Sequence, residues 1–196
     1  MLCKIIFNFS DFKSVKMSNS SDSKAVSESK KNVAKTENYK DGAWNLKYLQ
    51  FVNAFISQTG MSYGEAAQKA GITRQTIYHW FSKDDAKLSS VINFIDKCGY
   101  TVRFSLKRES NMIGDALVTI NSRDNFDTIG DKNLSFLDEA LTRYGIQRKD
   151  AAAKIGLGYT ALFYWFKHDD VFISYIYRIA EQNSLKLSIK IDPKQE

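Results

Sequence analysis

The stretch GEAAQKAGITRQTIYHWF, residues 64–81, returns later in the chain as KDAAAKIGLGYTALFYWF, residues 149–166. In both copies an alanine-rich run is followed by glycine, an aliphatic residue and a second run that ends in Trp-Phe. The apolar spacing of each run fits a helix, and glycine can take the positive φ that a sharp turn requires. Each copy therefore predicts two short helices joined by a tight turn.

A few positions explain why this spacing favours close helix packing. Ala67 is small enough to let the second helix approach, and Gly71 is expected at the turn four residues later. Ile77 and Trp80 lie one turn apart on the second helix and should face inward. The matching positions of the second copy hold Ala152, Gly156, Leu162 and Trp165.

With these residues, the two blocks at 45–108 and 133–192 resemble the Cro/C1-type (phage repressor-like) DNA-binding family. In that family the second helix of the helix-turn-helix enters the major groove. The resemblance implies two tandem repressor-like units and double-stranded DNA as the partner.

The duplication extends beyond the motif. A shift of 85 positions, which brings Trp80 onto Trp165, aligns the blocks without a gap from residue 49 to residue 106. Apolar spacing predicts a first helix from about residue 45 and a fourth helix over about 86–98, and residues 100–107 then alternate like a strand. Residues 185–192 alternate in the same way. We expect a mainly α fold of two four-helix units, each followed by a strand, with the strands in one small shared sheet that includes the run 116–120.

Several residues predict helix ends. Ser62 with Glu65 fits a capping box, and Thr73 fits the N-cap of the second motif helix. The acidic pairs 84–85 and 169–170 recur just before the fourth helix of each unit. We interpret them as caps of that helix rather than as catalytic carboxylates.

Composition divides the rest of the chain. Residues 1–44 are expected to be a disordered N-terminal arm, with Met17 as a candidate translation start, and residues 193–196 a tail. Residues 109–132 read as an acidic linker of net charge −3, whereas the first unit carries +5 and the second +1, within a total of +6. The positive charge that nucleic acid attracts is concentrated in the first unit.

The resemblance places the DNA-reading surface at the start of the second motif helix. Arginine can pair with guanine and glutamine with adenine through two hydrogen bonds each. The alternative is that the same side chains only solvate a surface helix. The candidate base readers are Thr73, Arg74, Gln75, Tyr78 and His79, and the candidate phosphate contacts are Lys69, Ser82 and Lys83.

The second copy is poorer in such donors. Its matching positions hold Gly158, Tyr159, Thr160, Phe163 and Tyr164, and cations that could reach phosphates are Arg148, Lys149, Lys154 and Lys167. Two interpretations stay open: this helix also contacts DNA, or it is a surface for a homodimer or another protein. The aromatic runs of both copies are otherwise expected to be core.

No motif in the sequence indicates catalysis. Cys3 and Cys98 have no metal-ligand spacing, and His79 and His168 lack further ligands, so we expect neither a metal nor a cofactor. We expect no membrane span, and a cytoplasmic location. The sequence predicts a non-enzymatic, sequence-specific DNA-binding regulator; the alternative is a protein-interaction module similar to antitoxin-type members of the family.

Overall fold

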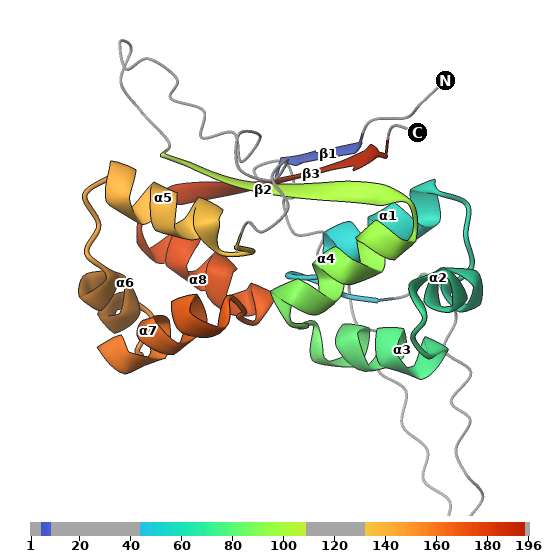
Figure 1. Cartoon of the computed structure of the whole chain (residues 1–196), viewed down its shortest axis with the longest axis horizontal. Coiled ribbons are helices and arrows are strands. Elements are labelled where there is room, and N and C mark those ends of the chain that lie inside the picture. The colour runs from blue at the N-terminus through green and yellow to red at the C-terminus, as the bar shows by residue number, and fades with distance from the viewer. Residues whose placement is uncertain (1–4, 9–43, 109–131, 195–196) are drawn as a thin grey trace, which may run out of the picture.

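The computed structural model describes residues 5–8, 44–108 and 132–194, and this part of the chain is mainly helical. It contains eight helices and three strands, arranged as two groups of four helices beneath one face of an antiparallel sheet (Figure 1). The linker with its run 116–120, the last two residues and most of the N-terminal arm lie outside the described residues. What we expect of them stays a prediction.

The order of elements repeats along the chain. The first group comprises α1 (Gln50–Gln58), α2 (Tyr63–Ala70), α3 (Arg74–Lys83), α4 (Leu88–Lys97) and β2 (Tyr100–Arg108). The second comprises α5 (Ser135–Arg143), α6 (Arg148–Lys154), α7 (Tyr159–His168), α8 (Ile173–Gln182) and β3 (Leu185–Pro193). Helix α1 begins five residues later than its apolar pattern suggested, because the preceding segment is held by Asp84, as described below.

Strands β2 and β3 pair along their whole length, as expected for a shared sheet. The antiparallel register places Val102 opposite Ile191 and Phe104 opposite Ile189, and all four side chains are buried against the helices. The Phe104 ring stacks on Phe136 of the second group, with 5.6 Å between ring centroids. One apolar core therefore runs through both groups.

A short strand in the N-terminal segment was not predicted. Strand β1 (Ile5–Asn8) pairs antiparallel with β3, on the edge that β2 leaves open, so the sheet order is β1-β3-β2. The expectation of disorder therefore fails at these four residues. The unpaired N–H and C=O groups of an edge strand offer hydrogen bonds that the pattern of the N-terminal segment does not reveal.

The α2–α3 turn forms as its residues predict. Gly71 takes φ +68° directly after α2, and Ala67 and Ile77 are buried where the two helices meet. Ser62 and Glu65 form the capping box, in which the hydrogen bonds from Ser62 lower the pKa of the Glu65 carboxyl. The Thr73 side chain accepts a hydrogen bond from the Thr76 N–H and caps α3.

The two groups meet in a short reciprocal backbone pairing. The Leu88 N–H donates to the Val171 carbonyl at 2.8 Å, and the Ile173 N–H donates to the Ala86 carbonyl at 3.0 Å. Ala86 and Lys87 therefore belong to this pairing rather than to a helix, which is why α4 begins at Leu88 and not at the predicted residue 86.

The acidic pairs cap helices, but not the helices we expected. The Asp84 carboxylate accepts hydrogen bonds from backbone N–H groups of residues 47–49, at 2.7 to 3.1 Å, and so caps the start of α1. Asp169 accepts from the N–H groups of Asn133 at 2.6 Å and Leu134 at 2.9 Å before α5. The first acid of each pair thus ties the third helix of its group back to the first.

The second acid of each pair crosses between the groups. Asp85 accepts hydrogen bonds from the Ser174 N–H at 3.1 Å and the Ser174 hydroxyl at 2.6 Å, at the start of α8. Asp170 accepts from the Ser89 N–H at 3.1 Å, at the start of α4. Each fourth helix is capped by the other group, so the prediction that each pair caps the helix following it in its own unit is wrong.

Candidate nucleic-acid interface

Helix α3 has one polar, exposed side. Ile77, Trp80 and Phe81 are buried in the core. The exposed residues at or after the N-cap are Thr73, Arg74, Gln75, His79, Ser82 and Lys83. Gln75, His79 and Ser82 follow one another at helical spacing, so they form a single stripe along the open side of the helix.

Tyr78 differs from the other candidate base readers. It is half-buried, and its ring packs against Trp44 and Tyr63 at centroid distances of 6.0 and 5.9 Å. The Arg74 guanidinium lies over the same ring, 4.9 Å from its centroid. Tyr78 therefore supports Arg74 from below, whereas Gln75 and His79 project from the open side.

The candidate phosphate contacts flank this stripe. Lys69 is exposed in the last turn of α2, and Lys83 is exposed at the end of α3. The Ser82 hydroxyl donates a hydrogen bond to the His79 carbonyl at 3.0 Å, so its proton is not available for a phosphate oxygen. The two lysines are the better candidates for phosphate, because each carries a full positive charge on an exposed side chain.

The matching surface on α7 is aromatic. Tyr159, Phe163 and Tyr164 expose 54 %, 51 % and 55 % of their area. Only Phe172, at 44 %, joins them as an exposed large apolar side chain in the described part of the chain. The polar or charged candidates Lys149, Lys154, Thr160 and Lys167 are also exposed, and the Lys154 amine donates to the Asn183 side-chain oxygen at 3.0 Å.

The expectation that the aromatic run of the second copy is core is wrong in part. Leu162 is fully buried, but Trp165 and Phe166 are only half-buried and Phe163 is exposed. At the position of Tyr63, whose ring packs against Tyr78 and Phe81 of α3, the second copy has Arg148. Fewer contacts are therefore available to cover the aromatic rings of α7.

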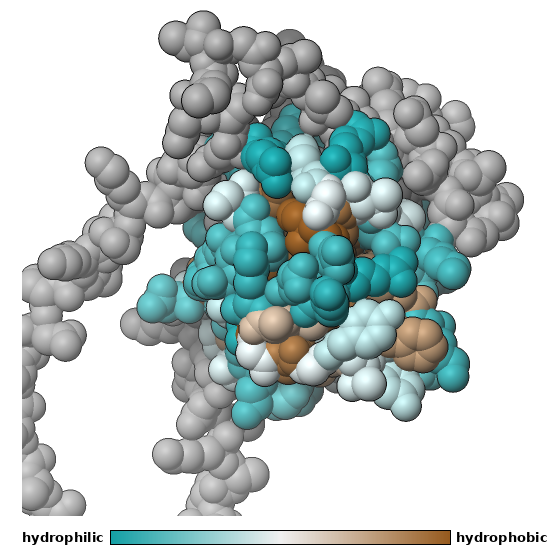
Figure 2. Space-filling view, turned by 90° about the vertical axis from the view of Figure 1, so that its left-hand side faces the viewer, coloured by the Kyte–Doolittle hydropathy of each residue, from teal (hydrophilic) through white to brown (hydrophobic). Residues whose placement is uncertain are grey.

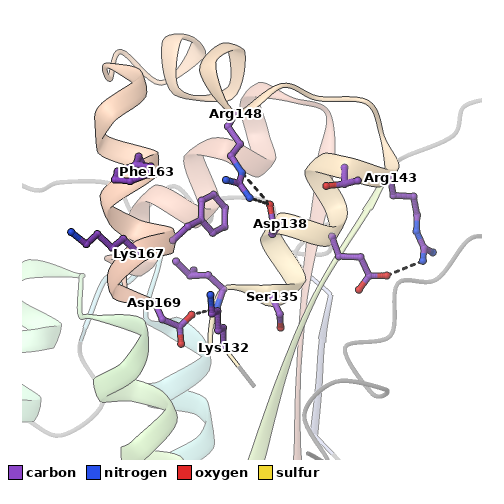
Figure 3. Close-up of a pocket in the computed structure, with 12 residues that line it drawn as sticks. Lys132, Ser135, Asp138, Arg143, Arg148, Phe163, Lys167 and Asp169 are labelled. Carbon is purple, nitrogen blue, oxygen red and sulfur yellow. Dashed lines mark hydrogen bonds and ion pairs between the residues drawn. The ribbon is translucent and has the colours of Figure 1, made fainter. Parts of the chain in front are cut away.

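Arg148 is already engaged within the protein. Its Nε and Nη2 atoms donate to one oxygen of Asp138 at 3.1 and 2.6 Å, and its guanidinium lies 4.4 Å from the centre of the Phe166 ring (Figure 3). A side chain held in this way gains less from a DNA phosphate than a free lysine would. Of the second-copy cations, Lys149 and Lys167 remain the better phosphate candidates.

A groove of ≈ 1110 Å³ lies beside α7. Leu134, Phe163 and Phe166 form its apolar lining, and Lys132 and Lys167 stand at its rim (Figure 3). Sequence reasoning did not find this groove, because its two sides come from α5 and α7 and no local pattern brings them together.

Neither a metal site nor a membrane helix is present in the described residues. No group of three or more His, Cys, Asp or Glu side chains is placed to hold a metal ion in residues 5–8, 44–108 and 132–194. None of the helices in these ranges combines the length and apolar character that crossing a bilayer requires. No family model, curated protein or solved structure matches this chain.

Proposed function

We propose that this protein is a non-catalytic, cytoplasmic regulator that binds double-stranded DNA in a sequence-specific way. In this proposal each α2–α3 and α6–α7 pair is a repressor-like helix-turn-helix, and α3 enters the major groove. Gln75, His79 and Arg74 read base edges there, while Lys69 and Lys83 hold phosphates.

One observation carries the proposal: α3 has its hydrogen-bonding side chains on the outer side and its apolar ones inside. The Thr73 cap fixes the start of the helix, and the buried Ile77 and Trp80 fix its rotation. Gln75 and His79 therefore point away from the core, on the side of the molecule opposite the sheet, where α3 lies in Figure 1. A helix placed this way can meet a groove without refolding.

The net charge supports the same assignment. The first unit carries +5, from nine basic and four acidic side chains, and the second carries +1, from eight and seven. Binding to phosphates depends on such an excess of cations and weakens as salt is added. DNA should therefore meet the first unit.

Selection from random duplexes followed by a salt titration tests the proposal. We expect one enriched motif and an affinity that falls as salt rises. An unselective pool, or an affinity indifferent to salt, would reject DNA reading by this chain.

Substitutions separate base reading from phosphate contact. Gln75→Ala should weaken binding to the selected motif about 5- to 150-fold, since a good base pair contact discriminates by about 1 to 3 kcal/mol, and relax the preference at one base pair. Lys83→Ala should weaken all sequences alike. The matched control is Thr160→Ala, at the position equivalent to Gln75 in the second unit, which should leave the preference unchanged.

A protein-interaction role, similar to that of antitoxin-type proteins, is the second candidate function. The exposed aromatic side chains of α7 favour it. It is compatible with DNA binding, because the aromatic side chains and the polar stripe lie on different units.

A further inference from the structure

The exposed aromatic side chains of α7 form a compact apolar surface. Tyr159, Phe163 and Tyr164 lie within two turns of one helix, and the Phe163 and Tyr164 rings are 6.1 Å apart. Figure 2 faces the end of the molecule that carries α6, and apolar atoms show between hydrophilic side chains both near the upper middle of this face and toward its lower edge. Aromatic side chains clustered in this way on a protein surface are typical of protein–protein contacts.

In the first unit, an aromatic ring covers the positions that match this surface. Tyr78 and Phe81 are the counterparts of Phe163 and Phe166 under the 85-residue shift, and the Trp44 ring packs against both, at 6.0 and 5.6 Å. The position equivalent to Trp44 is Ile129, which lies outside the described residues. The backbone frame of the repeat therefore holds an aromatic ring at this place, and the groove beside α7 has room for one.

The charges of the groove favour a protein over a nucleic acid. Four cations and three carboxylates line it, and two of the cations are already paired, Arg148 with Asp138 and Arg143 with Glu139. A phosphate backbone would meet carboxylates as well as cations here. A protein surface that carries both signs would meet opposite charges without a net repulsion.

The mixture of cations and carboxylates in the groove favours a second copy of this chain as the partner. A two-fold contact brings a surface against itself, so it must be self-complementary in charge and shape. The second unit, at +1, meets this condition, whereas the first unit, at +5, would repel its copy. In such a contact, an exposed aromatic ring of one copy can project into the groove of the other.

We propose that the α7 surface, defined by Tyr159, Phe163 and Tyr164 with the groove beside them, is a two-fold interface between two copies of this chain. An aromatic side chain of each copy enters the groove of the other, in the place that Trp44 takes in the first unit. Helices α3 and α7 lie in different halves of the molecule, both on the side away from the sheet (Figure 1), and neither the α7 surface nor its groove includes a residue of α3. The inference does not depend on DNA binding, because self-association is measured without DNA.

Sedimentation velocity of the full chain at about 1 to 100 µM tests the interface, since specific contacts commonly have dissociation constants at or below this range. The native chain should sediment as a particle of twice 22.4 kDa. Tyr164→Glu should raise the dissociation constant about tenfold or more, because aromatic residues at the centre of interfaces dominate binding.

The internal repeat supplies a matched control. His79→Glu makes the equivalent change on α3, and it should leave the dimer intact. Unchanged circular dichroism and melting of Tyr164→Glu would show that it folds, as its 55 % exposure suggests. Phe163→Ser, which adds no charge, should weaken the dimer in the same direction.

Three results would overturn the proposal. A native chain that is monomeric at every concentration would mean that the groove is covered within the chain or used by another partner. A dimer that survives both α7 substitutions would place the interface elsewhere. Equal weakening by His79→Glu and Tyr164→Glu would show a charge effect without a specific surface. None of these results bears on whether α3 reads DNA.

Discussion

Removing the carboxylate of Asp85 should loosen a helix that begins 88 residues further along the chain. Asp85 accepts hydrogen bonds from the Ser174 N–H and hydroxyl, at 3.1 and 2.6 Å, and from its neighbour Ala86 at 3.0 Å. Asp85→Ala deletes all three. The reciprocal change, Asp170→Ala, deletes the acceptor for the Ser89 N–H at the start of α4.

The expected destabilisation follows from the number and kind of bonds lost. Loss of an N-cap side chain costs about 0.5 to 2 kcal/mol, and hydrogen bonds to a charged acceptor lie at the upper end of such values. The Asp85 contacts are partly buried, so we expect each substitution to lower the free energy of unfolding by about 1 to 2 kcal/mol. For a chain of this length that lowers Tm by roughly 2 to 8 °C.

Amide hydrogen exchange distinguishes the crossed caps from local ones. Asp85→Ala should speed exchange of the Ser174 amide, and Asp170→Ala that of the Ser89 amide, in each case in the other unit. Asp96→Ala is the control, because it removes a surface ion pair with Lys194 and should change stability by less than about 1 kcal/mol. Exchange that increases only next to the substituted residue would refute the reciprocal arrangement.

Three other substitutions test single features of the fold. Burial raises the pKa of Asp192, but hydrogen bonds from Arg103 and Lys190 outweigh it and leave the pKa below its ordinary value. The stabilisation from this carboxylate should be complete above about pH 4 and be lost as pH falls through the folded-state pKa, so Asp192→Asn should reduce the difference in Tm between neutral and acid solution. Ser62→Ala breaks the capping box and should cost about 0.5 to 2 kcal/mol in urea unfolding, with intact α3 signals by NMR. Ile77→Ala opens a cavity at a fully buried position and should cost about 2 to 5 kcal/mol by the same measurement.

The parts of the fold that depend on local physics could be predicted. Ser62, Thr73 and Gly71 act within three or four residues of their own position, so their sequence neighbours determine their roles. The alternation of Val102 and Phe104 shows one buried face, because side chains of a strand point to opposite sides in turn. Pairing of the two strands then followed from the duplication, since each unit alone would leave a strand without a partner.

Contacts between distant segments could not be predicted in this way. The sequence shows that Asp85 precedes α4, but it does not show that α8 of the other unit begins nearer to its carboxylate than α4 does. In the same way, the sequence predicts Arg148 as a phosphate contact, but its guanidinium donates hydrogen bonds to Asp138 within the second unit. The exposure of Phe163 depends on residues outside α7, among them Arg148 at the position that Tyr63 takes in the first unit, and a helical pattern of α7 alone does not include them.

If the two proposals hold, the duplication explains how one chain can assign DNA binding to its first unit and self-association to its second. Both units need the same buried positions, so Ile77 and Leu162 are large and aliphatic, each fully buried. Exposed positions carry no such requirement, and there Gln75 and His79 are replaced by Thr160 and Tyr164. A chain that carries both His79→Tyr and Tyr164→His should therefore lose self-association and DNA selectivity together. His79→Tyr alone should reduce DNA selectivity, and Tyr164→His alone should weaken self-association. Loss of both properties from a single exchange would contradict the separation of the two surfaces.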